Sequence, residues 1–111
     1  MRISRKERGE AVVLAPAGPL IGTEADRLSK RIAKVLEAGA GALVLDVSAV
    51  PFIDSQGLEV LVDTTEGLIR TGKALRICGA NELLNEVFEL TDVASLFEQF
   101  DDVDAAVGSI G

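Results

Sequence analysis

The chain has 111 residues, which is enough for one domain with a single hydrophobic core. Hydrophobic residues make up 48% of it, and the formal net charge is −7. This acidity disfavours direct binding to nucleic acid or to an anionic membrane, because both would repel the domain. We therefore expect one domain over residues 1–111, with a partner of another class.

The counts of two residue types exclude several kinds of chemistry. The chain has no histidine, so it cannot form a Ser-His-Asp or Cys-His pair, and Cys78 is its only cysteine. A lone thiol is typical of a reducing compartment, and residues 1–8 are charged, without the apolar segment of a signal peptide. No apolar run is long enough to span a bilayer, and no glycine loop of the phosphate-cradling kind is present. We expect a cytoplasmic protein that is not an enzyme and needs no metal, nucleotide or other cofactor.

The first elements predicted are a hairpin and a helix. Residues 2–8 and 10–17 are typical of two strands that meet at Gly9. Thr23 is the predicted N-cap of the first helix, which we expect to end near Gly39.

The middle of the chain predicts a central strand followed by a second helix. Residues 42–47 are apolar at every position except Asp46, as in a central strand buried on both faces. Residues 50–53 are expected to form a loop or an edge strand, because Pro51 has no N–H group to donate to a neighbouring strand of a sheet. Residues 55–71 show helical spacing of apolar positions, namely Leu58, Leu61, Val62, Thr65, Leu68 and Ile69.

The last third predicts two more strands and two more helices. Residues 74–78 and 96–100 are the strands, and residues 101–107 the final helix. Asn81 is expected to cap a helix that runs to about Thr91 and turns Leu83, Leu84, Val87 and Phe88 inward. The resulting order, ββαβαβαβα, predicts an α/β domain with a mixed, mostly parallel sheet of about five strands and about four helices.

The most informative segment leads from the central strand into the second helix. Ser55 lies where that helix begins and is a good N-cap residue; it also follows a strand, at the edge where open α/β folds bind ligands. Gly57 is a poor helix former and indicates a close approach of backbone, either of this chain or of a partner.

The string Phe52-Ile53-Asp54-Ser55-Gln56-Gly57-Leu58 resembles the signature of the STAS family, typified by bacterial anti-sigma factor antagonists. The resemblance extends over essentially the whole chain, including the opening hairpin and the turn before Asn81. It implies that Ser55 is a phosphorylated serine. From the same motif and the adjoining acidic helix face we expect a partner-binding surface made of Asp54, Ser55, Gln56, Gly57, Glu59 and Asp63.

The resemblance further implies partner switching. The unphosphorylated domain would bind an anti-sigma factor that is also a serine kinase, which releases a sigma factor; phosphorylation would break that complex, and a serine phosphatase would restore it. The chain departs from the family at Gln56, where many relatives have a second serine. After the second predicted strand it has Gly18-Pro19-Leu20-Ile21-Gly22, where relatives often have an acidic residue. Because this loop flanks the same surface in relatives, the difference puts the identity of the partner in doubt more than the fold.

Other interpretations remain open at this point. Ser55 could be a plain helix cap, and Asp54 could stabilise the helix or contact the partner. The domain could be a STAS subunit of a lipid transporter, docking on its ATPase without a phosphorylation switch. A hydrolase with Ser55 as nucleophile is disfavoured, since no histidine and no Gly-x-Ser-x-Gly motif is present. The sequence does not distinguish a monomer from a weak dimer.

Overall fold

The computed structural model describes residues 1–110 and shows one α/β domain, as predicted. The elements follow the predicted order, with one extra 3-10 turn before the last strand. They are β1 (Arg2–Arg8), β2 (Ala11–Ala17), α1 (Gly22–Glu37), β3 (Ala42–Asp46), α2 (Ser55–Ile69), β4 (Arg76–Cys78), α3 (Glu82–Leu90), η1 (Ala94–Leu96), β5 (Glu98–Phe100) and α4 (Val103–Gly108).

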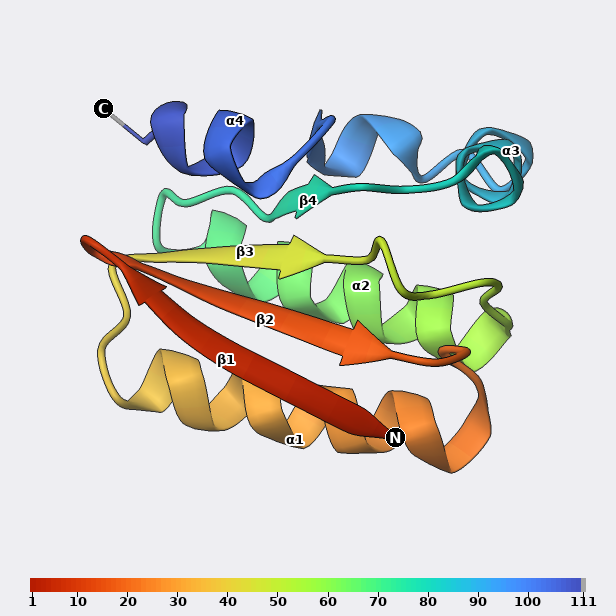
Figure 1. The fold of residues 1–111 in the computed structure, drawn as a ribbon, viewed down its shortest axis with the longest axis horizontal. Helices are drawn as coiled ribbons and strands as arrows, with labels where there is room; N and C mark the ends of the chain where they lie inside the picture. The colour runs from red at the N-terminus through yellow and green to blue at the C-terminus, as the bar shows by residue number, and fades with distance from the viewer. Residues whose placement is uncertain (111) are drawn as a thin grey trace.

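The five strands form one sheet in the order β1-β2-β3-β4-β5. Strand β1 is antiparallel to β2, and the other neighbours are parallel. In Figure 1, α1 and α2 lie behind the sheet, and α4 lies beyond β4, toward the side away from α1. The predicted mixed and mostly parallel sheet is therefore confirmed.

Two layers of core explain the apolar run of β3. Leu43 and Leu45 belong to the larger core with α1, α2 and α3, whereas Val44 faces the smaller core with α4. Because side chains alternate along a strand, a strand covered on both faces needs apolar residues at successive positions. Four of the five residues of β3 are buried.

Helix α2 packs on the sheet largely as expected. Leu61 is fully buried, and Leu68 is 3% exposed. The prediction for Ile69 is wrong: it is the last residue of α2, and its side chain is 59% exposed because Leu68 fills the core at this end. Leu83 is also wrongly placed inward, since Leu84 and Phe88 occupy the buried stripe of α3 and Leu83 remains 49% exposed.

Some predicted boundaries shift by a few residues. Helix α1 begins at Gly22, with Ile21 rather than Thr23 at the N-cap position. Strand β4 begins at Arg76, two residues later than predicted, and Leu96 lies in η1 instead of the last strand. Asn81 caps α3 as predicted, with its Oδ1 accepting from Leu84 N at 2.8 Å.

Candidate functional site

Two loops and a helix start meet at the carboxyl end of β2 and β3. Leu20 and Ile53 form an isolated parallel bridge that continues the pairing of these strands beyond the sheet. Leu20 N donates to Phe52 O at 3.1 Å, and Asp54 N donates to Leu20 O at 3.2 Å. The loop at residues 18–22 is thereby fixed against the segment that carries the predicted site.

Asp54 is the residue that joins these pieces. Its Oδ1 accepts from Gly57 N at 2.9 Å, so Asp54 is the N-cap of α2. Its Oδ2 accepts from Gly22 N, at the start of α1, at 3.1 Å. One carboxylate therefore satisfies an amide at the beginning of each of two helices, a need that every helix N-terminus has. This second bond also explains why α1 begins without a cap from Thr23.

The expectation that Ser55 is the N-cap is therefore wrong. Asp54 has the extended backbone of a cap residue, and Ser55 is the first residue of the helix. Ser55 is solvent-exposed, and its hydroxyl is not the acceptor that caps α2. It remains free for a partner or a modifying enzyme, beside the amides of the first turn.

The carboxyl group of Asp54 is held in its charged form. The hydrogen bond from Gly57 N–H is the largest influence and lowers its pKa. Desolvation opposes this with the next largest effect, and the bond from Gly22 N–H lowers the pKa further, so that the pKa stays below its ordinary value. A depressed pKa in the folded state means that the charged carboxylate stabilises the fold above the unfolded pKa. That contribution is lost as the pH falls through the lower, folded pKa.

Asp54 variants should separate its two hydrogen bonds. Asp54→Asn keeps one acceptor oxygen, so it can cap α2 at Gly57 but cannot also accept from Gly22. We expect the melting temperature at pH 7 to fall for Asp54→Asn and further for Asp54→Ala. Both variants should lose less stability than the wild type between pH 5 and pH 3. Equal melting temperatures for the three proteins at pH 7 would contradict this linking role.

Gly57 is buried where the helix touches the two loops. A Cβ atom at this position would lie 2.4 Å from both Leu20 O and Ile53 Cγ1. No partner can occupy this space, because the chain's own backbone fills it. The close approach inferred from the sequence is thus confirmed, and it is an internal packing contact. Gly57 can serve a partner surface only by holding that surface in shape.

The other predicted site residues lie on the solvent side of α2. Gln56, Glu59 and Asp63 are exposed, and the last two follow Ser55 at intervals of four residues, which places them along one helix face. The two threonines of α2, Thr64 and Thr65, do not present free hydroxyl groups on this face. Their hydroxyls donate within the helix, to Val60 O at 2.7 Å and to Leu61 O at 2.9 Å respectively.

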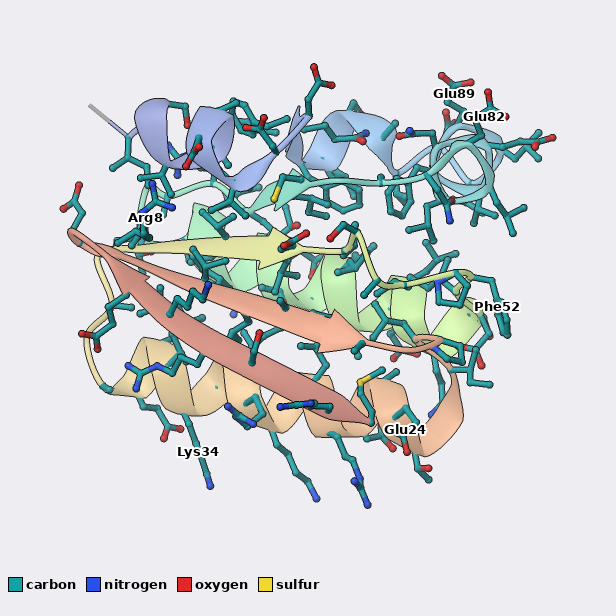
Figure 2. All side chains as sticks on the ribbon, viewed as in Figure 1. Arg8, Glu24, Lys34, Phe52, Glu82 and Glu89 are labelled. Atoms are coloured by element: carbon teal, nitrogen blue, oxygen red, sulfur yellow. The ribbon has the colours of Figure 1, made fainter. Side chains whose placement is uncertain are left out.

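Sequence reasoning missed several residues that shape this region. Phe52 is 45% exposed beside Ser55, although a large aromatic side chain usually becomes buried. Figure 2 shows its ring at the end of the molecule where the α2 segment begins. Asn81 holds the loop from the other side, since its Nδ2 donates to Pro51 O at 3.2 Å. A signal for Phe52 existed in the sequence, because it follows Pro51 in a loop and not in a strand.

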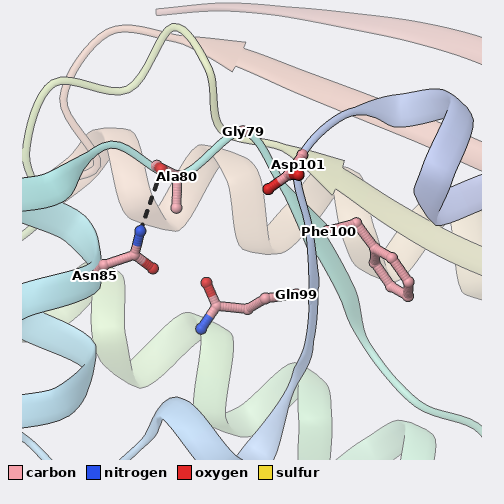
Figure 3. Close-up of a pocket in the computed structure, with 6 residues that line it drawn as sticks. All are labelled: Gly79, Ala80, Asn85, Gln99, Phe100 and Asp101. Carbon is pink, nitrogen blue, oxygen red and sulfur yellow. Dashed lines mark hydrogen bonds between the residues drawn. The ribbon is translucent and has the colours of Figure 1, made fainter.

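A second region, at the carboxyl end of β4, offers little chemistry. A cavity of about 150 Å³ lies there, and Figure 3 shows the residues that line it. Among them, Asn85 Nδ2 donates to Ala80 O at 3.3 Å. Asp101 is the only charged residue that lines it, and none of the predicted site residues does. Within residues 1–110, no cluster of three or more His, Cys, Asp or Glu side chains could hold a metal ion.

Cys78 is buried in the smaller core, as predicted for a small hydrophobic residue. Burial, together with the nearby charges of Asp46 and Asp102, raises the pKa of its thiol to about 11. Thiolate is the reactive form, so this cysteine is inert near neutral pH. None of the helices in the described part of the chain has both the length and the apolar character of a membrane span.

Comparison with known proteins agrees with this architecture. The family model described as STAS domain matches residues 2–106. The chain therefore belongs to the STAS domain family, as the motif around Ser55 predicted. A relative in Bordetella bronchiseptica, BtrV, is provisionally named an anti-sigma factor antagonist; it is 23% identical over 109 residues, covering 98% of this chain and 94% of BtrV.

Solved structures share the fold at low sequence identity. A protein of Thermotoga maritima, TM1081, again provisionally named an anti-sigma factor antagonist, superimposes with a TM-score of 0.91 at 24% identity, over 97% of this chain and 93% of its own. The Bacillus protein SpoIIAA in its phosphorylated form gives a TM-score of 0.72 at 15% identity, over 94% of this chain and 96% of its own.

Proposed function

We propose that this STAS domain is an anti-sigma factor antagonist that is switched off by phosphorylation of Ser55. In its unphosphorylated form it binds an anti-sigma factor with serine kinase activity in the cytoplasm, and a serine phosphatase reverses the modification. The names of BtrV and TM1081, and the phosphorylated form of SpoIIAA, support this assignment. We assign the domain itself no enzymatic activity, cofactor or nucleic-acid binding.

The observation that carries the proposal is the exposed hydroxyl of Ser55 on the first residue of α2, next to a charged Asp54. A phosphate group adds a charge of about −1.5 to −2. At a helix N-terminus the free amides and the helix dipole favour that charge, so the domain tolerates it. In a closed interface the same phosphate would be desolvated beside the Asp54 carboxylate, which opposes binding.

The partner surface extends from Ser55 over the solvent side of the site. Gln56, Glu59 and Asp63 offer an acidic, polar strip along α2, and Phe52 offers an exposed aromatic anchor beside it. Aromatic residues are common binding hot spots, and an acidic strip fits a partner with basic residues at the rim of its interface. Gly57 and Asp54 hold this surface in place from behind.

The test is a kinase assay with the anti-sigma factor of the same organism and ATP. We expect one phosphate per chain, placed on Ser55 by mass spectrometry. Ser55→Ala should take up none. Ser48→Ala, which alters another exposed serine in the neighbouring loop, should be modified like the wild type. Binding to a transporter ATPase, with no phosphorylation by any kinase partner, would overturn the proposal in favour of the transporter subunit.

A further inference from the structure

One face of the sheet is only partly covered. Helix α4 packs on β3, β4 and β5 and reaches Ala11 and Val13 of β2. Among the described residues no helix covers the rest of this face on β1 and β2, which lie in front in Figure 1. Register pairs of the hairpin share a face, so two columns of side chains lie there. This uncovered face consists of Arg2, Ser4, Lys6 and Arg8 on β1 and of Ala15 and Ala17 on β2. Val13, which is 5% exposed, lies at its edge beside α4.

The uncovered face is basic along one column and lined with small side chains along the other. Arg8 forms an ion pair with Asp104 at 2.9 Å, whereas Arg2 and Lys6 have no carboxylate within ion-pair distance in the described part of the chain. At the edge of this face, next to α4, lies a cavity of about 200 Å³. Lys6, Val13 and Ala15 of the hairpin line it on one side, and Asp46 of β3 and Val103 of α4 line it on the other. A cavity of ~150 Å³ can already hold a benzene molecule, so this one can accept an aliphatic side chain.

Helix α3, which follows β4 and lies at one end of the molecule in Figure 1, presents the complementary features. Leu83 and Leu90 are 49% and 79% exposed, and their spacing of seven residues puts them on one face of the helix. Glu82, Glu86 and Glu89 are exposed along one flank of that face, and Figure 2 shows Glu82 and Glu89 pointing away from the domain. From Ile77 to Ile110 the chain has eight acidic residues and no basic one.

We propose that α3 of one copy of this chain docks on the uncovered face of β1 and β2 of a second copy. Leu83 and Leu90 would lie over the small residues of β2, one of them entering the cavity, while the flanking glutamates meet the cations of β1. The dimensions agree. The two leucines are about 10 Å apart along the helix, and Val13 and Ala17 are about 13 Å apart along the strand. This inference does not depend on the proposed phosphorylation switch.

The contact is head-to-tail, because two different surfaces meet. The assembly then keeps one free α3 surface at one end and one free sheet face at the other, so growth continues into rings or chains. The net charge of −7 on each copy opposes association at long range. At physiological salt the Debye length is about 8 Å, which screens that repulsion but leaves ion pairs in direct contact effective. We therefore expect copies of the chain to associate weakly at about 150 mM salt.

The test is sedimentation of the full chain between about 20 µM and 1 mM at 150 mM salt, a range suited to small, transient interfaces. We expect the average mass to rise at least about 1.5-fold for the wild type. Lys6→Glu and Leu90→Glu should each remain monomeric, while their equimolar mixture forms a one-to-one dimer and no larger species. Both side chains are exposed, so the variants should fold, which circular dichroism verifies.

Matched controls place the same charge changes elsewhere. Lys30→Glu alters an exposed cation of α1, and Ile69→Glu alters an exposed hydrophobic residue of α2; both should associate like the wild type. A wild type that stays monomeric at 1 mM would overturn the inference. So would a Lys6→Glu variant that still associates, which would indicate pairing of α3 with α3, or a mixture of the two variants that stays monomeric.

Discussion

Gly57→Ala is expected to destabilise the domain by about 1–3 kcal/mol or more, the usual range for overpacking a filled site. The added Cβ would lie 2.4 Å from Leu20 O, and a backbone oxygen cannot swing aside as a side chain can. Either α2 shifts or the loop at residues 18–22 does. Denaturant unfolding measures the stability loss. The same displacement would distort the surface around Ser55, so the affinity for the anti-sigma partner should fall as well.

Gly67→Ala is the matched control in the same helix. Nothing lies within 4 Å of a Cβ at Gly67, and its backbone does not have a positive φ. Alanine should therefore stabilise α2 by up to about 1 kcal/mol, the difference in helix propensity between the two residues. The same Gly→Ala substitution is thus expected to lower the stability of the domain at position 57 and to raise it at position 67 of the same helix. If Gly57→Ala were as stable as the wild type, the tight junction at Leu20 would be wrong.

The fold was largely predictable because each element has a strong local pattern. Residues 42–47 could be recognised as a central strand because they are apolar at every position except Asp46, and β3 is indeed covered on both faces. Asn81 could be recognised as a cap, because its side chain bonds only three residues away. Where an element begins later than predicted, as β4 does by two residues, pairing with the neighbouring strands decides its limit, and the sequence does not show that pairing.

The location of the site was predictable from the sequence, but the hydrogen bonds that hold it together were not. Ser55 and Asp54 are both good cap residues, so local chemistry could not decide between them. The bond from Gly22 N to Asp54 Oδ2 spans 32 residues of sequence, and it favours Asp54 because only a carboxylate has a second oxygen to offer. Leu83 and Leu84 posed a similar choice, since the packing of α3 on the rest of the domain decides which of two adjacent leucines is buried, and local spacing does not show it.

This reassignment of the cap changes what substitutions at Ser55 should do. Because the hydroxyl does not cap α2, Ser55→Ala should alter stability by no more than about 0.5 kcal/mol, as is usual for an exposed position. It should bind the anti-sigma partner like the unphosphorylated wild type, and it should go on binding in the presence of ATP. Thermal melts and calorimetric titrations with and without ATP measure the two effects.

Ser55→Asp should fold like the wild type but bind the partner far more weakly. The new carboxylate lies in the first turn of α2, where the helix dipole favours a negative charge, so the domain accepts it. The complex must instead desolvate that charge beside Asp54, at a cost of several kcal/mol. At about 1.4 kcal/mol for each factor of ten, the affinity should fall at least about 100-fold.

Glu59→Gln is the control for charge on the same helix face, and it should change affinity by less than about tenfold, as exposed rim charges do. If Ser55→Asp bound the partner as tightly as Ser55→Ala, a negative charge at position 55 would not be what dissociates the domain from its anti-sigma partner.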